Sequence, residues 1–336
     1  MTARVRGQHS TRRYGVRSVQ VVRLDGPAAV EVREVEEPAA ADGQVLVDVR
    51  AAGVNFPDVL LTRGLYQYKP DPPFGLGSEL AGVVREAPAG SGFAAGDRVA
   101  AFSTYGAFSE VATVAVDQVV PLPDEVSFDA GACLPMNYLT AHFTLAVRGR
   151  VREGDDVLVH GAAGGVGTAV TQLARAMGAR VIAVVSSDAK AEVAKAAGAH
   201  DTVLVDGFKD AARELTGGKG VEIVVDPVGG DRFTDSLRSL APFGRVLVVG
   251  FTAGEIPTVR VNRLLLGNTE VVGVAWGGYA LAHEGYIHGQ WADLLPHLRS
   301  GALDPVISQS FPLEKAAEAL ALIDERRVTG KVVLQP

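Results

Sequence analysis

Cysteine is scarce in this sequence, and its scarcity limits the chemistry that the chain can perform. Cys133 is the single cysteine among 336 residues. One thiol excludes an internal disulfide and any zinc cluster built from several cysteines. It also suits a reducing compartment, so we expect a cytoplasmic protein in which Cys133 is a small core residue.

Long apolar runs and excess positive charge are missing as well. No apolar stretch approaches the roughly 18 residues that a membrane span needs, and the net charge is −7 without a basic stripe. We therefore expect neither a membrane nor a nucleic acid as a partner. The first 17 residues carry five arginines and no acid. We interpret residues 1–17 as a flexible basic tail, with a mitochondrial presequence as the alternative.

A glycine-rich turn near the middle of the chain is the most informative motif. An apolar run at residues 157–160 leads into glycines at every third position, and a helical pattern follows at 168–177. Glycines let backbone amides approach a pyrophosphate, and the helix that follows directs its positive end at that anion. A glycine turn without a ligand is the alternative for an isolated motif, but the later strand–helix units favour a dinucleotide site. The residues predicted to bind it are Gly161, Ala163, Gly164, Gly165, Val166 and Gly167.

The chain before this turn has a β pattern. Short runs rich in β-branched residues are separated by Gly, Pro and Asp, which is typical of a barrel or a sandwich. These runs lie at residues 19–22, 30–33, 45–49, 82–84, 98–101 and 110–114. A helical stretch at 128–147 then leads into the glycine-rich region.

From residue 157 onward, strands alternate with helices, which predicts a parallel sheet. The expected strands are 157–160, 180–185, 202–205, 222–225 and 245–249, with a clear helix at 231–240. Helices around 290–299 and 314–324 and a last strand at 331–334 return to the first domain. The predicted fold is α/β. A Rossmann-type doubly wound parallel-sheet domain (136–275) is inserted in a mainly β, partly open barrel domain (18–135 and 276–336) that holds the substrate.

Three segments together point to one family. Asn55-Phe56-Pro57-Asp58 with Arg63-Gly64-Leu65-Tyr66 is the first, Gly75-Leu76-Gly77-Ser78-Glu79-Leu80-Ala81-Gly82 is the second, and the glycine-rich turn is the third. They resemble the medium-chain dehydrogenase/reductase superfamily, and within it the zinc-free quinone oxidoreductases related to zeta-crystallin. Zinc alcohol dehydrogenases carry metal ligands at the positions of Asn55, Ser78 and Met136. The resemblance therefore implies that no metal is bound here.

The resemblance also implies a reaction. Without a Lewis acid to stabilise an alkoxide, hydride transfer from NADPH favours an acceptor that delocalises charge onto oxygen, such as a quinone or a related α,β-unsaturated carbonyl. The protein then needs to align two flat molecules and exclude water. An enoyl-thioester reductase is the alternative within enzymes. A non-catalytic NADPH-binding structural or sensor protein is the alternative of another class.

The cofactor preference is predicted from the end of the second strand of the parallel sheet. NAD enzymes place an acid there to hold the ribose hydroxyls, whereas this chain has Ser186 and Ser187, followed by Lys190. Hydroxyls and an ammonium suit the 2′-phosphate of NADPH, and the resembling family uses a lysine at the position of Lys190 for this contact. An ordinary solvated lysine is the alternative. Asp206, near the end of the third strand, would repel a phosphate beside it unless its side chain turns to solvent.

The remaining site residues follow from the resemblance alone. It implies that Asn55 and Thr140 lie near the nicotinamide, that Val228 and Gly250 line the cofactor groove, and that Arg327 approaches the cofactor. Tyr66 contacts the substrate or serves in packing, and we group it with Asn55 as a candidate catalytic residue. The resemblance also implies a homodimer, in which the run 271–276 pairs with its copy at the sheet edge.

Overall fold

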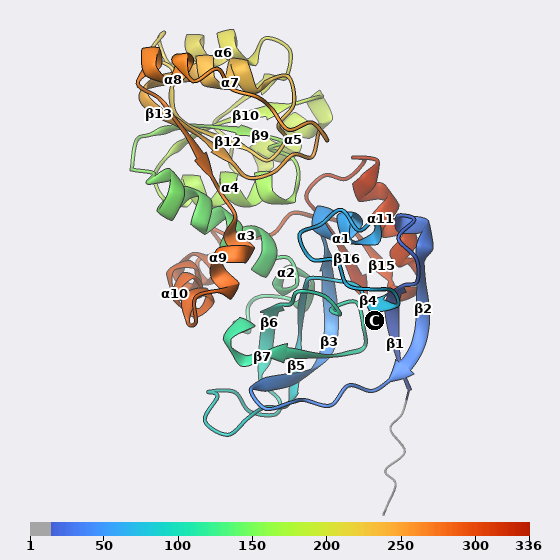
Figure 1. Cartoon of the computed structure of the whole chain (residues 1–336). Coiled ribbons are helices and arrows are strands. Elements are labelled where there is room, and N and C mark those ends of the chain that lie inside the picture. The colour runs from blue at the N-terminus through green and yellow to red at the C-terminus, as the bar shows by residue number, and fades with distance from the viewer. Residues whose placement is uncertain (1–14) are drawn as a thin grey trace, which may run out of the picture.

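The computed structural model describes residues 15–336, which form two lobes, each organised around its own β-sheet (Figure 1). One lobe contains a six-stranded sheet in the order β11–β10–β9–β12–β13–β14, and all of its neighbouring strands are parallel. The strands are β9 (Asp156–His160), β10 (Arg180–Val185), β11 (Asp201–Leu204), β12 (Val221–Asp226), β13 (Leu240–Val248) and β14 (Glu270–Gly273). From β9 the chain builds β10 and β11 on one side of β9, and it then crosses to β12 on the other side of β9. This is the topological switch point at which such sheets bind ligands.

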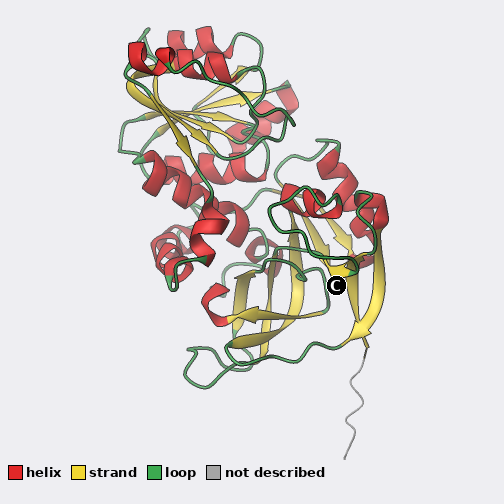
Figure 2. Cartoon of the chain, in the orientation of Figure 1, coloured by secondary structure: helices red, strands yellow, loops and turns green. Residues whose placement is uncertain are grey.

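Helices connect these strands and cover both faces of the sheet (Figure 2). They are α4 (Gly165–Ala176), α5 (Asp188–Ala196), α6 (Phe208–Leu215), α7 (Phe233–Ser239) and α8 (Asn262–Gly267). Every residue of β9 is buried, as expected for a strand with helices on both faces. The expected Rossmann-type doubly wound sheet is confirmed.

The other lobe is mainly β. Its larger sheet runs β15–β16–β3–β5–β6–β8 with β7 paired to β3, and a smaller sheet runs β2–β1–β4. Within residues 15–336, β8 and β15 end the larger sheet and do not pair with each other, so the barrel stays open as predicted. The strands are β1 (Gly15–Val21), β2 (Val30–Glu36), β3 (Gln44–Val54), β4 (Phe74–Gly75), β5 (Glu79–Glu86), β6 (Arg98–Phe102), β7 (Val111–Ala115), β8 (Val119–Pro121), β15 (Ile307–Pro312) and β16 (Lys331–Gln335).

The helical stretch expected at residues 128–147 is divided into three parts. They are α2 (Phe128–Gly131), α3 (Pro135–His142) and a π-helical segment, η3 (Phe143–Gly149). Pro135 starts α3 because proline fits the first turn of a helix but not its interior. The helix α3 packs against α4 and so connects the two lobes.

Four further helices and three short 3₁₀ turns complete the description of residues 15–336. They are α1 (Phe56–Thr62), α9 (Trp276–Leu281), α10 (Tyr286–Arg299) and α11 (Ala316–Asp324), and the turns are η1 (Pro27–Ala29), η2 (Val116–Gln118) and η4 (Leu313–Lys315). Among the described residues, no helix combines the length and the hydropathy that a membrane crossing requires.

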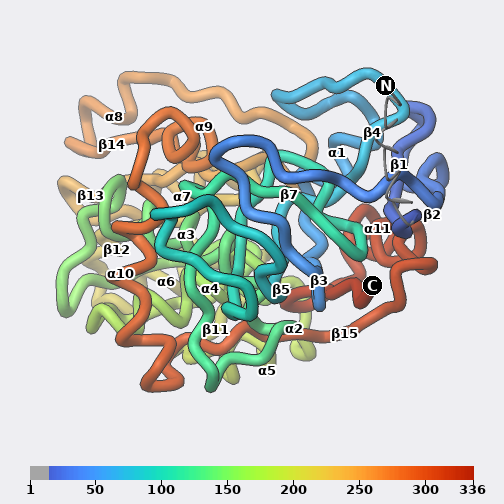
Figure 3. The backbone as a smooth tube through the Cα atoms, turned by 90° about the horizontal axis from the view of Figure 1, so that it is seen from below, coloured from blue at the N-terminus to red at the C-terminus, as the bar shows by residue number. Residues whose placement is uncertain are grey.

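The last strand returns to the first lobe. β16 pairs antiparallel with β3, so that Val332 lies opposite Val54, and Figure 3 shows the end of the chain beside β3 and α11. The strand predicted at residues 331–334 is therefore confirmed, and it brings the C-terminal segment next to Asn55. The domain boundaries 18–135, 136–275 and 276–336 remain predictions.

The basic tail expected over residues 1–17 overlaps the first strand. Residues 1–14 lie outside the described part of the chain, but residues 15–17 belong to β1 and pair with β2. The Arg17 amide and its Nε donate to the Glu110 carboxylate at 2.7 Å and 2.8 Å. The contact that orders this segment comes from a residue far along the chain.

Candidate active site

The turn between β9 and α4 has the geometry of an anion-binding site. Gly161 adopts a φ of +58°, which favours glycine. A Cβ on Gly167 would lie 2.2 Å from the Gly161 carbonyl oxygen, so the turn is too tight for a side chain there. The N-cap of α4 is Gly164, and no side chain caps the helix. Its first backbone amides are thus available to a pyrophosphate, and this cradle fits a dinucleotide.

The ends of the neighbouring strands meet at this turn. A Cβ on Gly161 would lie 3.3 Å from Val228 Cγ2, and a Cβ on Gly250 would lie 3.4 Å from the Pro227 carbonyl oxygen. Behind Val228, the buried Asp226 carboxylate accepts hydrogen bonds from the amides of Val228 and Gly229 at 2.8 Å and 2.9 Å. Burial raises the pKa of Asp226. The predicted residues Gly161, Val228 and Gly250 therefore lie close together.

The end of β10 carries the residues predicted to select NADPH. Ser187 is the N-cap of α5, and its Oγ accepts a hydrogen bond from the Lys190 amide at 3.4 Å. The Lys190 ammonium donates to Ser186 Oγ at 3.2 Å. The two serines and the lysine thus form one cluster at the surface. Asp206, which follows β11, is exposed to solvent.

Asn55 is the N-cap of α1, and its side chain is buried. Its backbone amide donates to Asp58 Oδ2 at 2.8 Å. Its side-chain Nδ2 donates to Glu79 Oε1 at 2.8 Å and to the Gly53 carbonyl at 3.2 Å. Its Oδ1 accepts a hydrogen bond from the Lys331 ammonium at 2.6 Å. The amide is therefore held from both ends.

Glu79 and Lys331 form a buried ion pair beside Asn55. Their side chains are 0% and 4% exposed, and Lys331 Nζ lies 2.7 Å from Glu79 Oε1. The same ammonium donates to the Val54 carbonyl at 3.0 Å, so each of its three protons has an acceptor. Glu79 Oε2 accepts a hydrogen bond from the Met136 amide at 2.8 Å. Buried charges persist only when they are paired and hydrogen-bonded in this way.

A second carboxyl group, Asp58, lies in the same region. Ser78 Oγ donates to its Oδ1 at 3.0 Å. Burial raises the pKa of Asp58 to about 7, although its hydrogen bonds from Asn55 and Ser78 act in the opposite direction. Tyr66 is half-buried against the apolar cluster around α1 and α11. The pKa of its phenol is raised, first by burial and then by the charge of Asp58.

The two lobes meet where the turn and this buried cluster touch. A Cβ on Gly165 would lie 2.9 Å from Lys331 Cδ and 3.2 Å from Asn137 Nδ2. Asn137 Nδ2 lies 3.5 Å from Asn55 Oδ1, and the Gly330 amide donates to the Ala163 carbonyl at 2.6 Å. The predicted catalytic Asn55 is thus connected to the predicted phosphate-binding turn through Lys331 and Asn137.

Two other predicted cofactor residues, Thr140 and Arg327, differ in their surroundings. Thr140 is buried on α3, three positions after Asn137 and so on the same side of the helix. Arg327 lies in the segment that leads to Gly330, and its exposed guanidinium donates to Glu325 at 3.0 Å. Thr140 therefore lies on the same side of α3 as Asn137, whereas the Arg327 side chain is directed toward Glu325.

The positions that carry metal ligands in zinc alcohol dehydrogenases serve other partners here. Asn55 binds Lys331, Ser78 binds Asp58, and the Met136 amide binds Glu79. Within residues 15–336, no group of three or more His, Cys, Asp or Glu residues lies close enough together to hold a metal ion. Cys133 is buried, and burial raises the pKa of its thiol.

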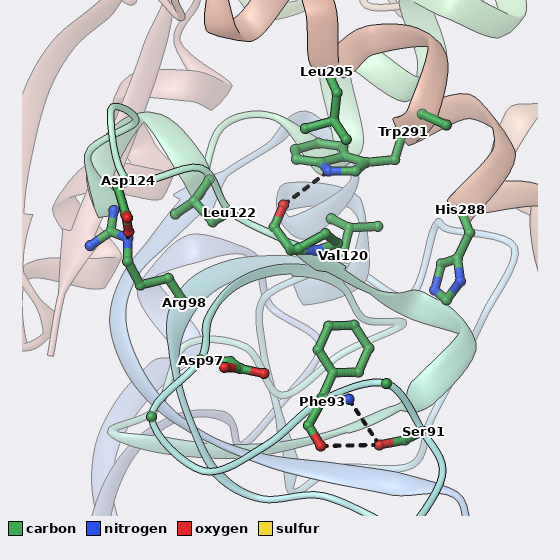
Figure 4. Close-up of a pocket in the computed structure, with 14 residues that line it drawn as sticks. Ser91, Phe93, Asp97, Arg98, Val120, Leu122, Asp124, His288, Trp291 and Leu295 are labelled. Carbon is green, nitrogen blue, oxygen red and sulfur yellow. Dashed lines mark hydrogen bonds and ion pairs between the residues drawn. The ribbon is translucent and has the colours of Figure 1, made fainter.

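An open groove of about 700 Å³ lies elsewhere on the molecule. It is formed by residues 91–98, the strand β8 and α10, and Figure 4 shows Phe93, Val120 and Trp291 along it. The Trp291 indole donates to the Pro121 carbonyl at 2.9 Å. None of the predicted cofactor or catalytic residues lines this groove, so we do not assign it to the active site.

Sequence reasoning missed three residues of the cluster. Asp58 and Glu79 were part of the family motifs but had no role assigned, and Lys331 was only the first residue of a predicted strand. A charged residue at the start of an apolar strand is the single local signal for Lys331. Its partner Glu79 is 252 positions away, so the sequence alone does not identify the pair.

Comparisons with known proteins agree with this arrangement. A model described as an alcohol dehydrogenase GroES-like domain matches residues 41–124, and one described as a zinc-binding dehydrogenase matches residues 165–298. The quinone oxidoreductase-like protein 2 of Rattus norvegicus is 38% identical over 332 residues, which cover 98% of this chain and 94% of that protein.

Solved structures show the same similarity. A probable oxidoreductase from Mycobacterium abscessus has a TM-score of 0.89 at 42% identity, with 96% of this chain and 100% of that chain covered. The Escherichia coli quinone oxidoreductase complexed with NADPH has a TM-score of 0.88 at 30% identity, with coverage of 95% and 100%. This chain therefore belongs to the quinone oxidoreductases of the medium-chain dehydrogenase/reductase superfamily.

Proposed function

We propose that this protein is an NADPH-dependent quinone oxidoreductase that reduces a quinone or a related α,β-unsaturated carbonyl without zinc. One observation carries the proposal: an uncapped, glycine-lined helix start is in contact with the buried Asn55–Glu79–Lys331 cluster. The relatives of this protein support the proposal, since they include a quinone oxidoreductase-like protein from rat and an Escherichia coli quinone oxidoreductase complexed with NADPH.

In this proposal the cofactor lies across the carboxyl ends of the parallel strands. The amides of the glycine-rich turn hold the pyrophosphate, and Ser186, Ser187 and Lys190 hold the 2′-phosphate. The residues expected to line the rest of the groove are Thr140, Val228, Gly250 and Asn55, with Arg327 at its margin. When bound, NADPH supplies the hydride.

The protein contributes orientation and the exclusion of water. Asn55 is held rigidly by Lys331 and Glu79, so it presents a fixed surface to the nicotinamide side of the site. We propose that Tyr66 contacts the flat substrate. The product oxygen takes its proton from solvent or from the site, and the negative charge that develops before this proton arrives is spread over the conjugated acceptor. Such an acceptor needs no metal ion to stabilise that charge.

A homodimer is the proposed assembly. β14 pairs with β13 on one side, and the apolar side chains around it are exposed. Val261, Leu265 and Leu266 are 75%, 76% and 80% exposed, and Val271 of β14 is 38% exposed. Figure 3 shows β14 and α8 side by side at one end of the molecule. A patch of this kind beside an open sheet edge favours pairing with a second copy. We also propose a cytoplasmic location, supported by the single buried cysteine.

The proposed activity is tested by steady-state assays that follow NADPH absorbance. We expect turnover with a simple benzoquinone and a much lower specificity constant with a trans-2-enoyl thioester. Prolonged chelation should leave the rate unchanged, and metal analysis should find well under one zinc per chain. A preference for the thioester would identify an enoyl-thioester reductase instead. NADPH binding without turnover of any quinone or enone would favour a structural or sensor role.

The Lys190→Ala variant tests the cofactor preference. Removing the ammonium beside Ser186 should raise the KM for NADPH by about ten-fold and leave the KM for NADH nearly unchanged, because NADH lacks the 2′-phosphate. Asp206→Asn should change the KM for NADPH and the KM for NADH little, because Asp206 is exposed to solvent. Specificity constants for both cofactors provide the measurement. Equal use of NADH and NADPH by the unmodified protein would contradict this assignment.

The Asp58→Asn variant tests the buried carboxyl group. The pKa of Asp58 is about 7 in the folded protein and 3.8 in its ordinary state, so folding binds a proton between these values. The contribution of Asp58 to stability is therefore lost as the pH rises toward 7, by up to about 1.4 kcal/mol per pH unit. The free energy of unfolding of Asp58→Asn, relative to the unmodified protein, should rise between pH 5 and pH 7 and then level off.

Denaturant unfolding at several pH values measures this difference. Asp324→Asn is the matched control, because Arg63 lowers the pKa of Asp324. The stability that Asp324 contributes is lost only below its ordinary pKa, so the effect of Asp324→Asn should stay constant over the same pH range. A flat difference for Asp58→Asn as well would show that Asp58 is ionised in the folded protein.

The Leu266→Glu variant tests the dimer. A charge on the exposed apolar face of α8 should convert a dimer into a monomer at micromolar concentration, because the new carboxylate would be buried against its copy. Leu204→Glu is the control, since Leu204 is 52% exposed on β11, at the opposite edge of the same sheet. Sedimentation velocity distinguishes the two species. A monomeric unmodified protein would exclude this assembly.

A further inference from the structure

Lys331 contacts both halves of the proposed active site. On one side its ammonium donates to Asn55 Oδ1 at 2.6 Å and to Glu79 Oε1 at 2.7 Å. On the other side its aliphatic stem lies against Gly165, where a Cβ would come within 2.9 Å of Lys331 Cδ. The preceding residue, Gly330, donates its amide to the Ala163 carbonyl at 2.6 Å. One short segment thus touches the phosphate-binding turn and the Asn55 amide.

The two charges determine which way the Asn55 amide points. The amide oxygen faces the ammonium of Lys331, and the amide nitrogen faces the carboxylate of Glu79. A rotation of the amide by a half turn would place Nδ2 against the ammonium and Oδ1 against the carboxylate. Both contacts would then be repulsive in a buried region, where charge interactions are strong. The ion pair therefore selects a single orientation of Asn55.

Stability alone does not explain a buried ion pair at this position. Replacing such a pair with neutral residues of similar volume is often neutral or stabilising, because each charge loses its hydration on burial. The described contacts of Lys331 and Glu79 include Asn55, Val54 and the Met136 amide. Asn55 is the side chain that hydrogen-bonds to both charges, and this points to a role in orienting it.

We propose that Lys331 is a positioning residue that, with Glu79, fixes the orientation of the Asn55 amide relative to the phosphate-binding turn. The inference rests on the proposed function, in which Asn55 lies beside the nicotinamide of bound NADPH. Lys331 then acts on hydride transfer through Asn55 and does not itself touch the substrate. Its loss should lower kcat more than it changes the affinity for NADPH.

The neutral double variant Lys331→Met with Glu79→Gln separates this role from folding. Lys331→Met alone leaves Glu79 as a buried unpaired charge, so that variant is expected to unfold easily. The double variant keeps the side-chain length at position 79, shortens it by one heavy atom at position 331 and leaves no unpaired charge. The oxygen of the new side-chain amide remains an acceptor for the Met136 amide. We expect a melting temperature close to that of the unmodified protein, an NADPH Kd within three-fold, and a kcat reduced by ten-fold or more.

Asn55→Ala shows whether Lys331 acts through Asn55. In an Asn55→Ala background, replacing Lys331 and Glu79 should lower kcat by less than two-fold further, because the side chain that they orient is already absent. The matched control is Arg63→Met with Asp324→Asn, which removes an ion pair of 2.6 Å that also joins distant parts of the chain but does not include Asn55. This control should leave kcat unchanged.

The fluorescence of bound NADPH provides a readout that does not depend on turnover. The double variant should change the emission of the bound nicotinamide, and Asn55→Ala should change it in the same way. A folded double variant with unmodified kcat and emission, or losses that multiply in the Asn55→Ala background, would overturn the inference. If the unmodified protein binds NADPH but reduces no quinone, the proposed function fails, and the emission measurement alone decides the role of Lys331.

Discussion

The buried contact between Lys331 and Glu79 constrains the rest of the active site. Two charges that are 4% and 0% exposed need a full set of partners, and the partners come from four elements. β3 supplies the Val54 carbonyl and leads into Asn55, β5 begins at Glu79, α3 supplies the Met136 amide, and β16 begins at Lys331. These elements must therefore converge at one point, where the larger sheet of the mainly β lobe meets α3, the helix that connects the two lobes.

The phosphate-binding turn depends on the same convergence. A side chain at position 165 would conflict with two features. One is the proposed approach of an anion to the start of α4, and the other is the stem of Lys331, which passes where a Cβ would lie. The Gly330–Ala163 hydrogen bond and the bridge between Gly164 and Gly330 connect the turn to the start of β16. A residue larger than glycine at position 165 would disturb the proposed anion site and the ion pair together. Both features therefore require glycine at this position.

Much of the fold could be predicted because it is specified locally. The strand expected at residues 180–185 coincides with β10. A short apolar run between two helices that end at glycines is typical of a buried strand. One error arises where distant contacts decide, because residues 15–17 join β1 through Glu110 and β2. Two further differences concern local features. The short helix α1 was not predicted. Pro135 divides the helical stretch that composition alone made continuous.

The candidate site also has one part that local sequence predicts and one part that depends on distant contacts. The glycine-rich turn is encoded within about ten residues, so its spacing and chemistry can be recognised in the sequence. The cluster at Asn55 cannot, because Lys331 and Glu79 are 252 positions apart and only the β16–β3 pairing brings them together. The cofactor half of this site is therefore local and general to dinucleotide folds, whereas the half that orients Asn55 is a product of the tertiary fold. It follows that variation among related chains that alters reactivity without altering cofactor binding should concentrate in the contacts of β16, β3 and β5.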